Sequence, residues 1–108
     1  MKSIKIAIMN KPWTVRLMKN GKYAKKNGDD SLAMTILKKR RIDISREGNT
    51  YETIGHELCH AYIYELCIHS AELDTDALEE IFCELMSKRG DELLKLARDT
   101  ARRLERYK

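Results

Sequence analysis

Two histidines and a glutamate near the middle of the chain have the spacing of a metal-binding motif. His56 and His60 are four residues apart, so on a helix they lie on one face, one turn above the other. Two imidazoles in this arrangement can bind one Zn²⁺ at about 2.0–2.1 Å each. Glu57 follows His56 directly, beside the metal rather than on it. There it can accept a proton from a metal-bound water, whose pKa is roughly 7. The motif therefore predicts a zinc site with Glu57 as general base.

A catalytic zinc site of this kind needs a third protein ligand. One subclass has a glycine and a third histidine at the positions that hold Ile63 and Leu66 in this chain, so that subclass is excluded. His69 follows His60 by nine residues, and a continuing helix would place it roughly 13 Å away. That distance is too long to close the site unless the chain turns back sharply.

A glutamate from the next predicted helix is the better candidate for the third ligand. Three glutamates compete there, namely Glu79, Glu80 and Glu84. On a helical wheel, Glu79 and Glu84 border the apolar stripe from its two sides, whereas Glu80 points away from it. Periodicity favours Glu79 or Glu84 and does not separate them.

The sequence around these residues resembles small phage-type zinc metallopeptidases related to the ImmA/IrrE group of gluzincins. Two segments carry the resemblance, TIGHELCHAYIYE at 53–65 and LEEIFCELM at 78–86. In that group the first glutamate of an E-x-x-(small or Val)-(Asp/Asn) segment is the third zinc ligand. Matched residue by residue, Glu79 takes the ligand position, Phe82 the small or Val position, and Cys83 the Asp/Asn position. The resemblance implies a zinc-dependent peptidase, with His56, His60 and Glu79 as metal ligands and a peptide or protein as substrate.

The first half of the chain has the patterns of β-strands. Apolar and polar residues alternate over 4–8, and a β-rich run resumes at 13–17 after a break that contains Pro12, which predicts a hairpin with a proline-containing turn. Residues 19–31 are polar and predict a loop. A further strand pair is expected around 34–37 and 41–45. By the resemblance, the strand at 41–45 is expected to pair with an extended substrate by strand addition.

The second half has the patterns of helices. Asn49 is expected to cap a helix together with Glu52. Residues 54–68 are apolar almost all the way round, which predicts a buried helix. Four ionisable residues interrupt it and, if buried, need partners or a metal: His56, Glu57, His60 and Glu65.

A second helix is expected from residue 74 or 75 to about 88, with Gly90 as its C-terminal cap and a further helical segment at 91–107. Five residues form its predicted core stripe: Leu78, Ile81, Phe82, Leu85 and Met86. The chain thus predicts one zincin-like domain over 1–108, of the α+β class. Its small antiparallel or mixed sheet is followed by an active-site helix and one or two further helices.

The composition of the chain indicates the cellular compartment in which we expect the protein. No apolar run is long enough to span a membrane, and the N-terminus lacks the apolar core of a signal peptide. The three cysteines form no CxxC, which suits a reducing cytoplasm. We therefore expect a cytoplasmic protein without a membrane partner, and the resemblance implies a bacterial host cell and a phage or prophage origin.

Two other functions are compatible with the sequence. The first is a catalytically inactive, metal-stabilised phage interaction protein, because 108 residues leave little room for substrate recognition. The second is nucleic-acid binding through the arginines at 98, 102, 103 and 106, which recur at helical spacing. Few aromatic residues accompany those arginines, and the net charge is only +4, so nucleic acid is the less favoured partner. The oligomeric state is left open.

Overall fold

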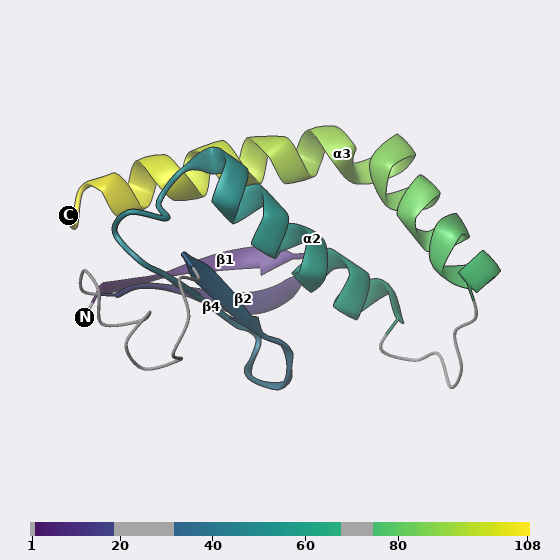
Figure 1. The fold of residues 1–108 in the computed structure, drawn as a ribbon, viewed down its shortest axis with the longest axis horizontal. Helices are drawn as coiled ribbons and strands as arrows, with labels where there is room; N and C mark the ends of the chain where they lie inside the picture. The colour runs from purple at the N-terminus through teal and green to yellow at the C-terminus, as the bar shows by residue number, and fades with distance from the viewer. Residues whose placement is uncertain (1, 19–31, 68–74) are drawn as a thin grey trace.

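A computed structural model describes residues 2–18, 32–67 and 75–108 of the chain (Figure 1). The elements are β1 (Lys2–Ile8), β2 (Lys11–Leu17), β3 (Ala33–Ile36), a short 3-10 helix η1 (Leu37–Lys39), β4 (Arg41–Ile44), α2 (Tyr51–Cys67) and α3 (Thr75–Glu105). A mixed four-stranded sheet is therefore followed by two helices, which confirms the predicted α+β class. The predicted loop at 19–31 and His69 lie outside the described residues. Neither described helix is long and apolar enough to cross a membrane.

The first two strands form the predicted hairpin, but its turn differs from the prediction. Met9 and Asn10 make the turn, with φ of 50° and 66°, the positive values that a tight two-residue hairpin loop requires. Pro12 lies within β2, opposite Ala7 of β1. Proline is tolerated there because β4 pairs with β2 only from Thr14 onward, so no partner on that side needs an N–H from Pro12.

The strand order in the sheet is β1-β2-β4-β3. β4 runs parallel to β2 and antiparallel to β3, so both of its sides are already paired. The expectation that residues 41–45 add a substrate strand is therefore wrong. Among the described strands, β1 and β3 are the edges of the sheet, and of the two β3 has the more extensive contact with α2.

Both helices cover the same face of the sheet (Figure 1). The strands turn alternate side chains toward them, and the core that results contains Ile4, Ile6, Ile8, Trp13, Val15, Leu17, Ile42 and Ile44 from the sheet. The helices contribute Ile54, Leu58, Ala61, Tyr62, Leu85, Leu93, Ala97 and Leu104. The period of two in the strands and the mixed spacing of three and four in the helices bring these side chains into one layer.

The start of α2 is capped by Thr50 rather than by Asn49. The Thr50 hydroxyl oxygen accepts a hydrogen bond from the Thr53 backbone N–H at 3.2 Å. The Asn49 amide instead donates to the Ala101 carbonyl oxygen at 3.1 Å and to the Glu105 carboxylate at 3.2 Å. Asn49 therefore ties the start of α2 to the last turns of α3, which fixes the antiparallel arrangement of the two helices.

The predicted break at Gly90 is absent, because α3 is one continuous helix of 31 residues. Gly90 is buried within it. The predicted core stripe in the first half of α3 is also largely wrong. Leu85 is fully buried, but Leu78, Phe82 and Met86 are 46%, 53% and 50% exposed.

Replacing Gly90 by alanine tests the continuity of α3. An added Cβ would meet only the end of the Met86 side chain, at 3.9 Å. Because glycine in a helix interior costs roughly 0.5–1 kcal/mol relative to alanine, Gly90→Ala should raise the free energy of unfolding by about that amount. Gly48→Ala is the contrasting variant, since its Cβ would collide with the Leu32 carbonyl oxygen, and it should lower the free energy of unfolding. Loss of stability in Gly90→Ala, measured by urea unfolding, would instead indicate a helix end at that position.

A buried carboxylate connects α2 to the sheet. Glu65 accepts a hydrogen bond from the Trp13 indole N–H at 2.9 Å and another from the Arg40 guanidinium at 2.6 Å. Burial by itself raises the pKa of Glu65. The hydrogen bonds from Arg40 and Trp13 and the charges of Arg40 and Lys11 outweigh that effect, so the pKa lies below its ordinary value of 4.5. Glu65 and Arg40 therefore form an ionised pair in the folded protein at neutral pH.

Substitutions of Glu65 should separate the carboxylate charge from the indole hydrogen bond. Glu65→Ala leaves the buried indole N–H without an acceptor, which should cost about 1–3 kcal/mol of unfolding free energy. Glu65→Gln keeps an acceptor for Trp13 and should cost less at pH 7. The pKa of Glu65 is lowered in the folded protein, so its negative charge adds to the free energy of unfolding fully above pH 4.5. This contribution is lost as the pH falls through the folded pKa. The stability difference between wild type and Glu65→Gln should thus shrink below pH 4.5.

Fluorescence of Trp13, the sole tryptophan, can follow unfolding at each pH. A stability difference that stays constant from neutral to acidic pH would contradict the ionised pair.

Candidate metal centre

The rotation of α2 about its axis decides where its ionisable residues point. Ile54, Leu58 and Ala61 are fully buried against the core. The two histidines lie on another side of the helix, and both are exposed, with the His56 side chain 71% exposed. The expectation of histidines within a buried helix is therefore wrong, and they face solvent, where an ion can reach them.

His56, Glu57 and His60 form a cluster of potential metal ligands. One ligand atom from each of the three lies within 4.8 Å of the other two. The imidazole ring centres are 5.0 Å apart with the rings inclined at 79°. His56 Nε2 lies 3.9 Å from Glu57 Oε2. The three residues that the sequence singled out are thus brought together.

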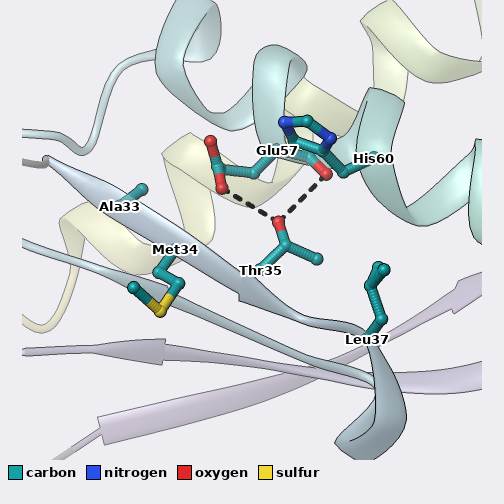
Figure 2. A pocket seen from close by; sticks show the side chains of 6 residues that line it. All are labelled: Ala33, Met34, Thr35, Leu37, Glu57 and His60. Carbon is teal, nitrogen blue, oxygen red and sulfur yellow. Dashed lines mark hydrogen bonds between the residues drawn. The ribbon is translucent and has the colours of Figure 1, made fainter.

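Edge strand β3 holds the carboxylate of Glu57 in place (Figure 2). The Thr35 hydroxyl donates to Glu57 Oε1 at 2.9 Å and lies 3.3 Å from the Glu57 backbone carbonyl oxygen. Glu57 itself is only 8% exposed. Its Oε1 is therefore occupied by the strand, while Oε2 is the oxygen nearer to His56. The sequence did not identify Thr35, because a single threonine in a four-residue strand carries no signal of a contact 22 residues away.

Two hollows adjoin one another between α2 and β3. The first, of about 320 Å³, is lined by Ala33, Met34, Thr35, Leu37, Glu57 and His60 (Figure 2). The second, of about 380 Å³, is lined by Leu32, Ala33, Glu52, Thr53, His56 and Glu57. We call the two together the cleft. Glu57 and Ala33 belong to both hollows, so the Glu57 carboxylate lies at the middle of the cleft.

The predicted third ligand lies away from this cluster. An alanine-like Cβ on Gly55 would be 3.8 Å from the Ala97 Cβ, and Asn49 bonds to Ala101, so α3 runs antiparallel to α2. In this register, residues near 92–96 of α3 lie level with the two histidines. Glu79 is 13 residues before Glu92, roughly 20 Å along the helix axis.

The other two candidate glutamates also lie outside the cluster. Glu79, Glu80 and Glu84 are all exposed, and Glu84 forms an ion pair with Lys88 at 3.2 Å. Among the described residues, the metal-ligand cluster contains His56, Glu57 and His60 and none of these three glutamates. The assignment of Glu79 as a ligand stays a prediction.

Cysteine and tyrosine side chains of α2 do not add to the site. Burial raises the pKa of the Cys59 thiol, which disfavours the thiolate that a metal would bind. Tyr62 is fully buried. Burial first, and then the charge of Glu92, raise its pKa to about 12. Tyr64 contacts Trp13 edge-on, with ring centres 6.3 Å apart. Both tyrosines are thus part of the packing between α2 and its neighbours.

The donor set fits a divalent metal ion. Imidazole nitrogens and a carboxylate oxygen are ligands that zinc accepts. Neither imidazole makes a hydrogen bond to another part of the described chain. Both rings can therefore turn toward a common ion without breaking a hydrogen bond. His56 and His60 would bind the ion, and the described residues leave the remaining positions to water or to residues elsewhere. The donors themselves do not select zinc over other divalent ions.

Comparison of the chain with protein-family models, with curated proteins and with solved structures found no match.

Metal titration tests this cluster directly. Wild type should bind about one Zn²⁺ per chain, and His56→Ala and His60→Ala should each lose most of the affinity, because each removes one of the two imidazoles that would bind the ion. Elemental analysis after dialysis and calorimetric titration measure both quantities. Glu79→Ala and Glu84→Ala show whether either glutamate is a third ligand, by weaker binding in one of them. Equal zinc binding in His60→Ala and wild type would contradict the site.

Proposed function

We propose that the protein is a metal-dependent peptidase in which His56 and His60 bind the ion and Glu57 acts as general base. The observation that carries the proposal is the position of the three residues. The Glu57 carboxylate lies where the two hollows of the cleft adjoin, His60 lines one hollow and His56 the other, and one ligand atom from each of the three residues lies within 4.8 Å of the others.

The hydrogen bond from Thr35 supports a proton-transfer role for Glu57. A general base must be held within reach of the proton that it accepts. Thr35 occupies Oε1 at 2.9 Å and leaves Oε2 to take the proton. A bound zinc ion would supply Lewis acidity and lower the pKa of its water. Glu57 would then accept the water proton on Oε2 and return it to the leaving amine.

Within residues 2–18, 32–67 and 75–108, the edge of β3 that faces away from β4 pairs with no strand, which supports an extended peptide as the substrate. β3 pairs with β4 on one side, and its other side borders the cleft. An added strand would gain backbone hydrogen bonds along Ala33–Ile36. It would run past Glu57 with one hollow on either side, so side chains before and after the cleaved bond would each have space. The strand-addition role predicted for residues 41–45 thus moves to β3.

Nucleic acid remains the less favoured partner. Three of the four C-terminal arginines have partners within the chain. Arg102 pairs with Asp99 at 2.8 Å, Arg103 donates to the Lys5 carbonyl oxygen, and Arg98 lies over the Tyr51 ring. The ion pair with Asp99 offsets the charge of Arg102, and the contacts of Arg98 and Arg103 hold those two side chains against the protein. We keep a bacterial cytoplasm and a phage or prophage origin as predictions from the sequence.

The variant Glu57→Gln separates hydrolysis from metal binding. It keeps the shape of the side chain and an acceptor for Thr35 but cannot accept the water proton. We expect cleavage of a peptide mixture, followed by mass spectrometry with zinc-loaded protein, to fall at least about 100-fold, because general bases contribute roughly 10²–10⁴. Bound zinc should stay near one per chain. Glu47→Gln, an exposed glutamate just before α2, is the matched control and should leave cleavage unchanged.

Two results would contradict the proposed function. If zinc-loaded wild type cleaves none of the peptides, the metal-stabilised interaction protein becomes the better explanation. If Glu57→Gln cleaves as fast as wild type, Glu57 is not the base.

A further inference from the structure

The two hollows of the cleft differ in the side chains that line them. Met34 and Leu37 give the hollow of about 320 Å³ two large apolar side chains beside Glu57 and His60 (Figure 2). We call it the apolar hollow. The hollow of about 380 Å³ contains a second carboxylate, that of Glu52, and we call it the acidic hollow. Neither hollow has a lysine or arginine among the residues that line it.

The charge of Glu52 is available to a ligand. Glu52 is exposed in the first turn of α2, one turn before His56, so both residues lie on the same side of the helix. Within the described part of the chain, Glu52 makes no hydrogen bond or ion pair. The turn before α2 carries Arg46 and Glu47, two exposed residues whose opposite charges offset each other. The acidic hollow therefore favours a cation.

The apolar hollow disfavours a cation. Lys38 and Lys39 directly follow Leu37, and both are exposed with no ion pair to another described residue. Their charges repel a basic side chain from this end of the cleft. Met34 and Leu37 are 36% and 37% exposed, so an apolar side chain that covers them removes apolar surface from water. The two ends of the cleft thus favour different side chains.

We propose that the preferred substrates are peptides with a lysine or arginine on one side of the cleaved bond and a large apolar side chain on the other. The inference rests on the proposed peptidase function and names its substrate class. The basic side chain would extend toward Glu52, and the apolar one would lie against Met34 and Leu37. A peptide added along β3 can reach both hollows, because strand residues two apart share a face and are roughly 6.5–7 Å apart.

Cleavage of a defined peptide mixture by the zinc-loaded wild type tests the substrate class. Mass spectrometry of the products should show lysine and arginine enriched within two residues on one side of the cleaved bond and large apolar residues on the other. One cleaved peptide is then remade with lysine, norleucine or glutamate at the basic position. The lysine peptide should be cleaved about two- to fivefold faster than the norleucine peptide, the effect expected of an exposed ion pair.

Substitutions of Glu52 should change the ratio between these peptides. Glu52→Gln should abolish the preference for lysine, and Glu52→Lys should reverse it in favour of the glutamate peptide. Glu47→Lys is the matched control, because it makes the same change of charge at an exposed residue that lines neither hollow, and it should keep the preference. An acidic residue in the first turn also stabilises a helix. A loss of stability would slow the cleavage of all three peptides alike and leave their ratio unchanged.

Binding measurements separate this inference from the peptidase activity. The probes are fluorescein-labelled octapeptides of alanine and threonine that contain a leucine and, two or three residues to either side of it, lysine, norleucine or glutamate. Fluorescence anisotropy follows their binding to zinc-loaded Glu57→Gln. Lysine peptides should bind about two- to fivefold more tightly than norleucine peptides, and adding Glu52→Gln should remove the difference.

The two measurements together decide between the possible outcomes. Selective binding of lysine peptides without cleavage by the wild type would support the ligand class and overturn the peptidase function alone. Equal cleavage of lysine and norleucine peptides, or a preference that Glu52→Gln leaves unchanged, would overturn this inference and leave the peptidase function standing. Absence of both binding and cleavage would overturn both.

Discussion

The contact of Glu65 with Arg40 and Trp13 sets the orientation on which the rest of the site depends. A buried carboxylate is stable only where charge and hydrogen bonds compensate its loss of water. Arg40, which lies between η1 and β4 with a φ of 46°, supplies the positive charge and one hydrogen bond to Glu65. Trp13 of β2 supplies a second hydrogen bond through its indole N–H. Because all three partners are fixed by their own elements, α2 can neither turn about its axis nor slide along the sheet without breaking the contact.

That constraint places Glu57 against β3. Glu57 is eight residues before Glu65, about two turns away on the helix and rotated by roughly 80°. With Glu65 held toward the sheet, Glu57 points to the edge strand, where Thr35 binds it at 2.9 Å. The histidines follow one residue before and three residues after Glu57, so they are turned to solvent beside it. The ion pair of Glu65 with Arg40, together with the buried side chains of Ile54, Leu58 and Ala61, therefore sets the direction of three cleft residues that the pair does not touch.

The sequence predicted what depends on local chemistry. Alternation found the strands, helical spacing found His56, Glu57 and His60 as a group, and apolar density found α2. It did not predict features that depend on tertiary partners. Thr35 donates a hydrogen bond to Glu57 only because β3 lies at the sheet edge beside α2. The Asn49 side chain is directed to α3, where its amide nitrogen donates to Ala101, and the Thr50 hydroxyl caps α2 in its place.

The errors on α3 have one physical cause. Helical periodicity finds the apolar side of a helix but contains no information on how far its neighbour extends. Leu85 is buried and Phe82 is exposed because α2 ends at Cys67, between the levels of the two residues. The prediction that Gly90 ends the helix was wrong for a similar reason. A glycine marks a helix end only where the chain also turns, and the local sequence does not show whether it turns. Here the helix continues through Gly90, which is buried, and the first half of the helix carries Leu78, Phe82 and Met86 beyond the reach of α2.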